Sequence, residues 1–73
     1  MTRDEVIQRA QAVTQAEGWP WREPVHVERV QQGLIFGRID WHVMTNANDR
    51  GGNVNIWIDN QSGKVTKKGF ARR

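Results

Sequence analysis

The chain has 73 residues, no cysteine and a formal net charge of +3 at pH 7. A chain of this length forms one small domain, here residues 1–73, and without cysteine it has no disulfide, thiolate metal site or cysteine nucleophile. No apolar run approaches the roughly 20 residues of a membrane span, and the N-terminus lacks the layout of a secretion signal. We therefore expect a soluble protein with no membrane partner, located in the cytoplasm, where small domains without disulfides are common.

The first predicted element is a helix over residues 2–17. Thr2 and Glu5 have the spacing of a capping box, in which each side chain binds a free backbone N–H of the first turn. Gly18 ends the helix and Pro20 cannot continue it. The apolar stripe at helical period consists of Val6, Ile7, Ala10 and Val13. Because isolated helices of about 15 residues are marginal in water, this one needs a sheet to lie on.

Two tryptophans flank the proline that follows the helix, in the segment Gly18-Trp19-Pro20-Trp21. Proline fixes its own φ at about −65° and stiffens the exit from the helix. We expect the two tryptophans, which are separated by this one residue, to point in roughly opposite directions. We predict that Trp19 or Trp21 closes the end of a core that contains Trp41. The other one then stays available to a partner, since tryptophan is enriched among interface hot spots.

From Pro24 onwards the apolar residues recur with period two, which predicts strands. The segments Gln31-Gln32-Gly33, 46–52 and 60–63 are typical of turns and loops. The four expected strands cover about residues 25–30, 34–45, 53–59 and 64–68. With short connections, these elements predict an α+β fold in which the N-terminal helix packs on a three- to four-stranded antiparallel meander sheet.

The two long strands each have one apolar face and one mixed face. The apolar faces carry Ile35, Ile39, Trp41 and Val43 in one strand and Val54, Ile56 and Ile58 in the next. The mixed faces carry Leu34, Phe36, Arg38, Asp40, His42 and Met44 in the first strand and Asn55, Trp57 and Asp59 in the second. We expect the helix to cover the apolar side and the other side to remain free for recognition.

One sequence pattern resembles a known family. It consists of Trp41-His42-Val43 and the run Ile-x-Ile-Asp-x-x-Ser-Gly-Lys-Val from Ile56 to Val65. This pattern resembles the PepSY-type module and the related small immunity proteins of a nuclear-transport-factor-like fold. The resemblance covers about the last half of the chain and the position of the helix, and the Trp-Pro-Trp segment and the basic end depart from it. It implies a non-catalytic binding or inhibitory module and supplies no catalytic residues.

Candidates for catalysis are few. Asp40 and His42 share one strand face, where the carboxylate could orient the imidazole, although a hydrated sheet face has the same pattern. No serine or cysteine nucleophile has a recognisable setting, and the two histidines and scattered carboxylates lack the spacings of zinc sites. We therefore expect no enzymatic activity, no cofactor and no bound metal.

The C-terminal segment from Lys64 onwards carries five basic residues, and no acidic residue follows Asp59. Lysines protect an exposed edge strand from aggregation, and a basic cluster also attracts polyanions or acidic protein faces. Our leading hypothesis is a binding or inhibitory module that meets a protein partner, or forms a homodimer, through an exposed sheet face or edge. The alternative is a nucleic-acid-binding protein that stacks bases on exposed aromatics. The candidate binding residues are Trp19, Trp21, Phe36, Arg38, Trp57, Lys64, Lys67 and Lys68.

Overall fold

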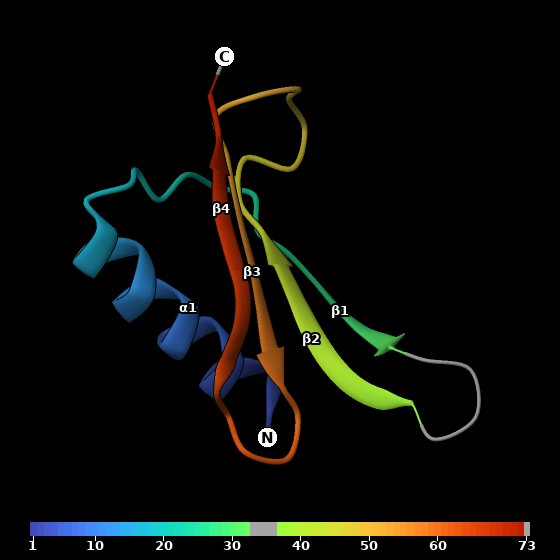
Figure 1. The fold of residues 1–73 in the computed structure, drawn as a ribbon. Coiled ribbons are helices and arrows are strands. Elements are labelled where there is room, and N and C mark those ends of the chain that lie inside the picture. The colour runs from blue at the N-terminus through green and yellow to red at the C-terminus, as the bar shows by residue number, and fades with distance from the viewer. Residues whose placement is uncertain (33–36, 73) are drawn as a thin grey trace.

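The computed structural model describes residues 1–32 and 37–72, and within them it has one helix and a four-stranded sheet. The strands pair antiparallel in chain order, so the sheet is a meander with its first and last strands at the edges. Figure 1 shows the helix crossing one face of the sheet, which confirms the predicted α+β class. The elements are α1 (Arg3–Glu17), β1 (His26–Gln32), β2 (Arg38–Met44), β3 (Asn53–Asp59) and β4 (Val65–Ala71).

Both ends of α1 form as the sequence predicts. The Thr2 hydroxyl accepts a hydrogen bond from the Glu5 N–H at 3.2 Å, and the Glu5 carboxylate accepts one from the Thr2 N–H at 3.0 Å. Gly18 ends the helix with a φ of 73°, a left-handed conformation that favours glycine. One polar residue, Thr14, is buried on the apolar stripe because its hydroxyl donates to the Ala10 carbonyl at 2.7 Å.

The core lies between α1 and the centre of the sheet. Its fully buried apolar side chains are Val6, Ala10, Val43, Val54, Ile56 and Ile58. The alternation in β3 therefore faces the way the sequence predicts, with Trp57 on the side away from the core.

The edge strands are longer than the sequence pattern indicates. Gln31 and Gln32, expected in a turn, pair with the start of β2 and belong to β1. At the other edge, β4 continues to Ala71, because Phe70 pairs with Val54 and packs against the core. The long strand expected over 34–45 is described only as Arg38–Met44, and the expectation for Phe36 lies outside the described residues.

The helix covers only part of the sheet. It contacts β2 and β3, and the hairpin of β1 and β2 extends away from it (Figure 1). Ile39, on the helix side of β2, is consequently 43 % exposed. Trp41, expected inside the core, is only partly buried. The Arg29 guanidinium lies 5.3 Å from its ring centroid, and its indole N–H donates to Asn60 at 2.6 Å.

Candidate functional site

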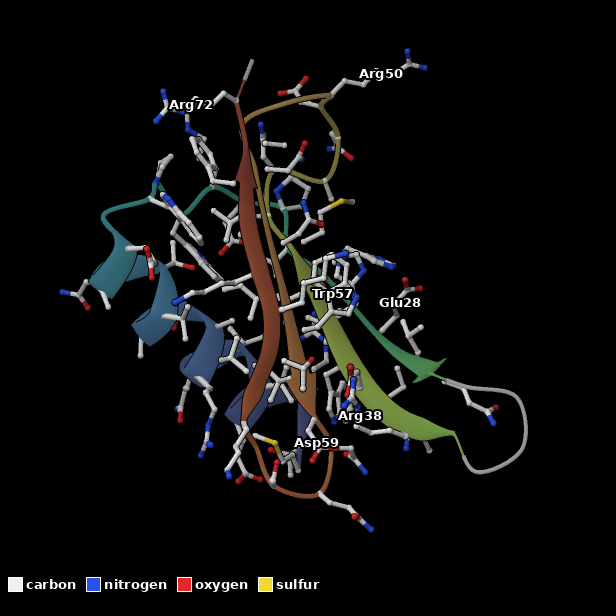
Figure 2. All side chains as sticks on the ribbon, viewed as in Figure 1. Glu28, Arg38, Arg50, Trp57, Asp59 and Arg72 are labelled. Atoms are coloured by element: carbon white, nitrogen blue, oxygen red, sulfur yellow. The ribbon has the colours of Figure 1, made fainter. Side chains whose placement is uncertain are left out.

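The face of the sheet opposite α1, which we call the outer face, carries polar and aromatic side chains. Among residues 1–32 and 37–72, α1 is the only helix, and it packs on the other face (Figure 1). Figure 2 shows Glu28, Arg38 and Trp57 on the side of the sheet away from α1. These three residues come from β1, β2 and β3 respectively, so one surface collects side chains from distant parts of the chain.

A single row of side chains runs across all four strands of the outer face. Glu28 is opposite His42 in the β1–β2 register, His42 is opposite Trp57 in the β2–β3 register, and Trp57 is opposite Lys67 in the β3–β4 register. Directly opposite residues in antiparallel strands share a face and lie within reach of each other. We call these four residues, Glu28, His42, Trp57 and Lys67, the cross-strand row.

The Trp57 indole is held from both sides. Its ring stacks on the His42 imidazole, with 4.3 Å between the centroids and an interplanar angle of 7°. The Lys67 ammonium lies 4.9 Å from the indole centroid, in the geometry of a cation–π contact. Because β2 and β4 flank β3 on opposite sides, these two contacts cover the two faces of the indole. The tryptophan therefore has a fixed orientation before any partner arrives.

The β1 end of the row is acidic. The Glu28 carboxylate lies 3.4 Å from His26 and 3.5 Å from His42. Hydrogen bonds from these two histidines lower the pKa of Glu28 below its ordinary value. The other ring nitrogen of His42 is 2.8 Å from the Asn55 side-chain oxygen, which fixes the imidazole plane against Trp57. The row thus runs from a carboxylate in β1 to an ammonium in β4.

Next to the row, Asp40 forms a buried anchor for Arg38. The Asp40 side chain is only 1 % exposed, and it accepts two hydrogen bonds from the Arg38 guanidinium at 3.0 and 3.2 Å. The Thr66 hydroxyl donates to the same carboxylate at 3.0 Å. A register shift between Trp57 and Ile58 lets both Thr66 and Lys67 lie on the outer face. A shallow hollow is lined by Arg38, Asp40, Trp57, Thr66 and Lys67.

The acid–base pair suggested by the sequence is not assembled. Asp40 and His42 do share the outer face, as their spacing predicts. However, Asp40 bonds to Arg38 and Thr66, whereas His42 bonds to Glu28 and Asn55. Each side chain therefore serves a separate polar cluster.

The sheet divides the predicted binding residues into two groups. Arg38, Trp57 and Lys67 lie together on the outer face, where they line the hollow. Lys68 points to the helix side and donates to Glu17 at 2.6 Å. Lys64 is exposed just before β4, and Phe36 lies outside the described residues.

Trp19 and Trp21 also lie on the helix side, and both pack against the core. Both are only partly buried and line a hollow with Gln11, Thr14 and Gln15, so the availability of one of them to a partner stays a prediction. The chain after the helix is held against the sheet by hydrogen bonds. The Trp19 N–H donates to the Thr14 carbonyl, and the Arg22 carbonyl accepts from Asn46. The Trp19 ring stacks on Phe70 with 6.2 Å between the centroids, while the buried Trp21 indole N–H has no hydrogen-bond partner within residues 1–32 and 37–72.

Sequence reasoning missed two members of the site, Glu28 and Thr66, and the burial of a third, Asp40. Glu28 belongs to a strand whose register was unknown, so its place opposite His42 was not predictable. Asp40 looked like a hydrated surface residue, and its burial follows from the joint cover of Arg38 and Thr66. Thr66 shares the outer face with Lys67 only because of the bulge. The alternation of β2 and β3 was the one signal that placed Arg38 and Trp57 correctly.

Metal ligands are not gathered in the part of the chain that the structure describes: no three His, Asp or Glu side chains there are arranged to hold an ion. In the same residues, no helix combines the length and apolar character needed to cross a membrane.

Comparison of the chain with protein-family models found no match. Searches of curated proteins and of solved structures also found none. The function is therefore inferred from the geometry of the outer face.

Proposed function

We propose that this protein is a non-catalytic binding module that recognises another protein through the outer face of its sheet. The observation that carries this proposal is a tryptophan fixed at the centre of a sheet face that α1 leaves open, with His42 on one side of the ring and Lys67 on the other. Tryptophan and arginine are the residues most enriched among interface hot spots. Side chains that are already ordered lose little entropy on binding, which favours affinity.

The chemistry around Trp57 supports a protein partner. Interfaces combine an aromatic centre with a polar rim of both charges, and here Glu28 and Lys67 supply opposite charges at the two ends of the row. Arg38 is 54 % exposed while its guanidinium is held by the buried Asp40. Its remaining N–H groups are therefore presented in a fixed direction, which suits recognition of a carboxylate or a backbone carbonyl.

Nucleic acid, the alternative partner, is supported less well by this geometry. Single-strand binders stack bases on free aromatic faces, but both faces of the Trp57 indole are already covered. A base would have to displace His42 or Lys67. The carboxylate of Asp40 is buried and neutralises Arg38, and those of Glu28 and Asp59, on the same face, oppose a phosphate backbone there. The basic residues of β4 are the feature that keeps this alternative open to test.

We also propose that the protein has no catalytic activity. Asp40 and His42 have separate partners, which leaves no oriented acid–base pair, and the resemblance to PepSY-type modules implies binding or inhibition. We also place the protein in the cytoplasm as part of this proposal, because a chain of 73 residues without cysteine suits a reducing compartment.

Site-specific photo-crosslinking in the source cells tests the proposed function. A benzoylphenylalanine replaces Met44, which lies on the outer face opposite Asn55, and the control carries it at Gln8 on the exposed side of α1. We expect one protein to be captured at position 44 and not at position 8. Adding Trp57→Ala should abolish the capture while circular dichroism still reports a folded protein.

Two results would overturn the proposed function. Capture of nucleic acid at position 44, with tryptophan fluorescence quenched by oligonucleotides at low salt, would favour the alternative. Absence of any captured macromolecule at position 44 would remove the outer face as an interface.

A further inference from the structure

The edge of the sheet formed by β4 pairs with no other strand in the described residues. β4 is the last strand of the sheet and lies beside β3 (Figure 1). Every second residue of such an edge directs its N–H and C=O groups away from the sheet, where another strand can pair with them. Addition of a partner strand to an edge of this kind is a recurring mode of peptide recognition.

The β4 edge is basic on both faces. Lys67 points to the outer face and Lys68 to the helix side, because consecutive residues of a strand alternate. Both side chains are exposed, as is Lys64 just before the strand, and β4 itself contains no acidic residue. The Lys68 ammonium also pairs with Glu17 of α1 at 2.6 Å, so an acidic partner residue on the helix side would share or replace that contact. A neutral or basic strand gains nothing from these charges, whereas a strand with two consecutive acidic residues meets one lysine on each face.

Gly69 lies beside the two lysines, and the fold does not require a glycine there. Its φ is not in the left-handed region, and a Cβ built on it would have no atom within 4 Å apart from those of its two chain neighbours. Glycine inside a strand weakens the strand by roughly 0.5–1 kcal/mol relative to alanine. Such a glycine often marks a place where another backbone or a large side chain approaches closely. Because Gly69 has no side chain, the outer face next to Lys67 is not covered at this position.

We propose that β4 binds an extended acidic segment of a protein partner as a fifth, antiparallel strand. Two consecutive acidic residues of the partner lie opposite Lys67 and Lys68, and a large apolar side chain just before them lies over Gly69. This inference rests on the proposed function and names the chemistry of the partner. The added strand extends the outer face of the sheet, so Lys67 belongs both to the outer face and to the β4 edge.

A second copy of this chain does not fit the same edge. Its only pair of consecutive acidic residues is Asp4-Glu5, and both lie in the first turn of α1. Its other edge strand, β1, has the sequence HVERVQQ with a single acidic residue. The lysines therefore discourage pairing between copies and still permit pairing with an acidic strand. Protection of the edge from aggregation would explain the lysines of β4, but it would not explain why Gly69 lacks a side chain.

Titration with a designed peptide, followed by NMR of the isotope-labelled protein at low salt, tests this inference. The probe is acetyl-Val-Thr-Phe-Glu-Glu-Thr-Val-amide, and the charge control has Lys-Lys in place of Glu-Glu. We expect the acidic peptide to shift the amide resonances of β4 and to slow their hydrogen exchange, while those of β1 do not change. The control should bind at least about fivefold more weakly, since each cross-strand charge pair contributes a few tenths to about 1 kcal/mol.

Variants separate the roles of charge and of the open glycine. Lys67→Glu should reverse the preference between the two peptides, whereas Arg50→Glu, in the β2–β3 loop (Figure 2), changes the net charge equally and should leave it unaltered. Gly69→Val should keep or raise the melting temperature of the free protein and still weaken binding of the acidic peptide at least about fivefold.

The inference is overturned if the acidic peptide does not bind at millimolar concentration, or if both peptides bind equally. Shifts of amide resonances that are confined to the outer face, without slowed hydrogen exchange in β4, would also overturn it. Unchanged binding of the acidic peptide by Gly69→Val would rule out the proposed apolar contact over Gly69. Failure here is distinguishable from failure of the proposed function. A protein captured at position 44 with no peptide binding to β4 leaves that function standing and removes only the edge strand.

Discussion

His42 and Trp57 stack nearly parallel across the two central strands, with 4.3 Å between their ring centroids. On the opposite face, their strand neighbours Val43 and Ile56 are also cross-strand partners and are buried beneath α1. The centre of the sheet is therefore packed on both sides, by apolar contacts inside and by an aromatic pair outside. This double packing allows so small a sheet to present an ordered aromatic surface.

The stack should contribute measurably to stability. In a double-mutant cycle of His42→Ala and Trp57→Ala, we expect a coupling free energy of about 0.5–1.5 kcal/mol, because aromatic pairs contribute that much beyond the area they bury. Urea unfolding of the four proteins measures it. The control cycle pairs His42→Ala with Trp19→Ala, since Trp19 packs on the other side of the sheet. A coupling as small as that of the control would mean that the stack is incidental.

Arg38 should matter more than its exposure suggests. Arg38→Ala removes both the principal cation and part of the cover of the Asp40 carboxylate, and we expect a loss of about 1–2 kcal/mol in the free energy of unfolding. Lys64→Ala removes an equally charged but exposed residue and should cost less than about 0.5 kcal/mol. Adding Asp40→Asn to Arg38→Ala should recover part of the loss. Equal urea midpoints for the two single variants would contradict this account.

Acid should destabilise the protein below about pH 5. Hydrogen bonds from His26 and His42 lower the pKa of Glu28 from its ordinary value of 4.5, and those from Ser62 lower the pKa of Asp59 from 3.8. A folded-state pKa below the unfolded one gives stability that is present above the unfolded pKa and is lost as the pH falls through the folded pKa. The free energy of unfolding, measured in urea from pH 7 to pH 3, should therefore decline at the acid end. Glu28→Gln should flatten that decline, and an unchanged slope would remove Glu28 as a contributor.

Two glycines with the same φ of 73° should respond differently to alanine. At Gly18 a Cβ meets nothing within 4 Å, so Gly18→Ala should cost only the left-handed strain of about 1 kcal/mol. At Gly63 a Cβ would lie 2.5 Å from the Arg9 guanidinium, which donates to the Gly63 carbonyl at 2.7 Å. We expect Gly63→Ala to cost about 1 kcal/mol more than Gly18→Ala in urea unfolding. In an Arg9→Ala background the two costs should become equal, and a persistent difference would point to another cause.

Much of the architecture was predictable because local patterns were strong. The capping box of Thr2 and Glu5 and the terminal Gly18 marked α1, and the alternation from Val54 to Ile58 marked β3 within its observed bounds. The edge strands were less predictable. Lysines and a glycine interrupt the apolar signal of β4, so Phe70, its main contact with Trp19, appeared to lie beyond the strand.

The candidate site was predictable only one strand at a time. Alternation placed Trp57 and Arg38 on the face away from the core, but it carried no information about what lies opposite them. Residue type alone groups Trp19 and Trp21 with them, but hydrogen bonds between the post-helix segment and the β2–β3 loop hold these two on the other side.

The helix, the strands and the apolar face of each central strand follow from local sequence patterns, because they depend on side-chain periods of 3.6 and 2 residues within one segment. The cross-strand row, the burial of Asp40 and the partial cover of Trp41 arise only when the chain is folded. Those features depend on register, on a bulge and on where one short helix lies across the sheet. Such relations join residues far apart in the chain, and no local pattern encodes them.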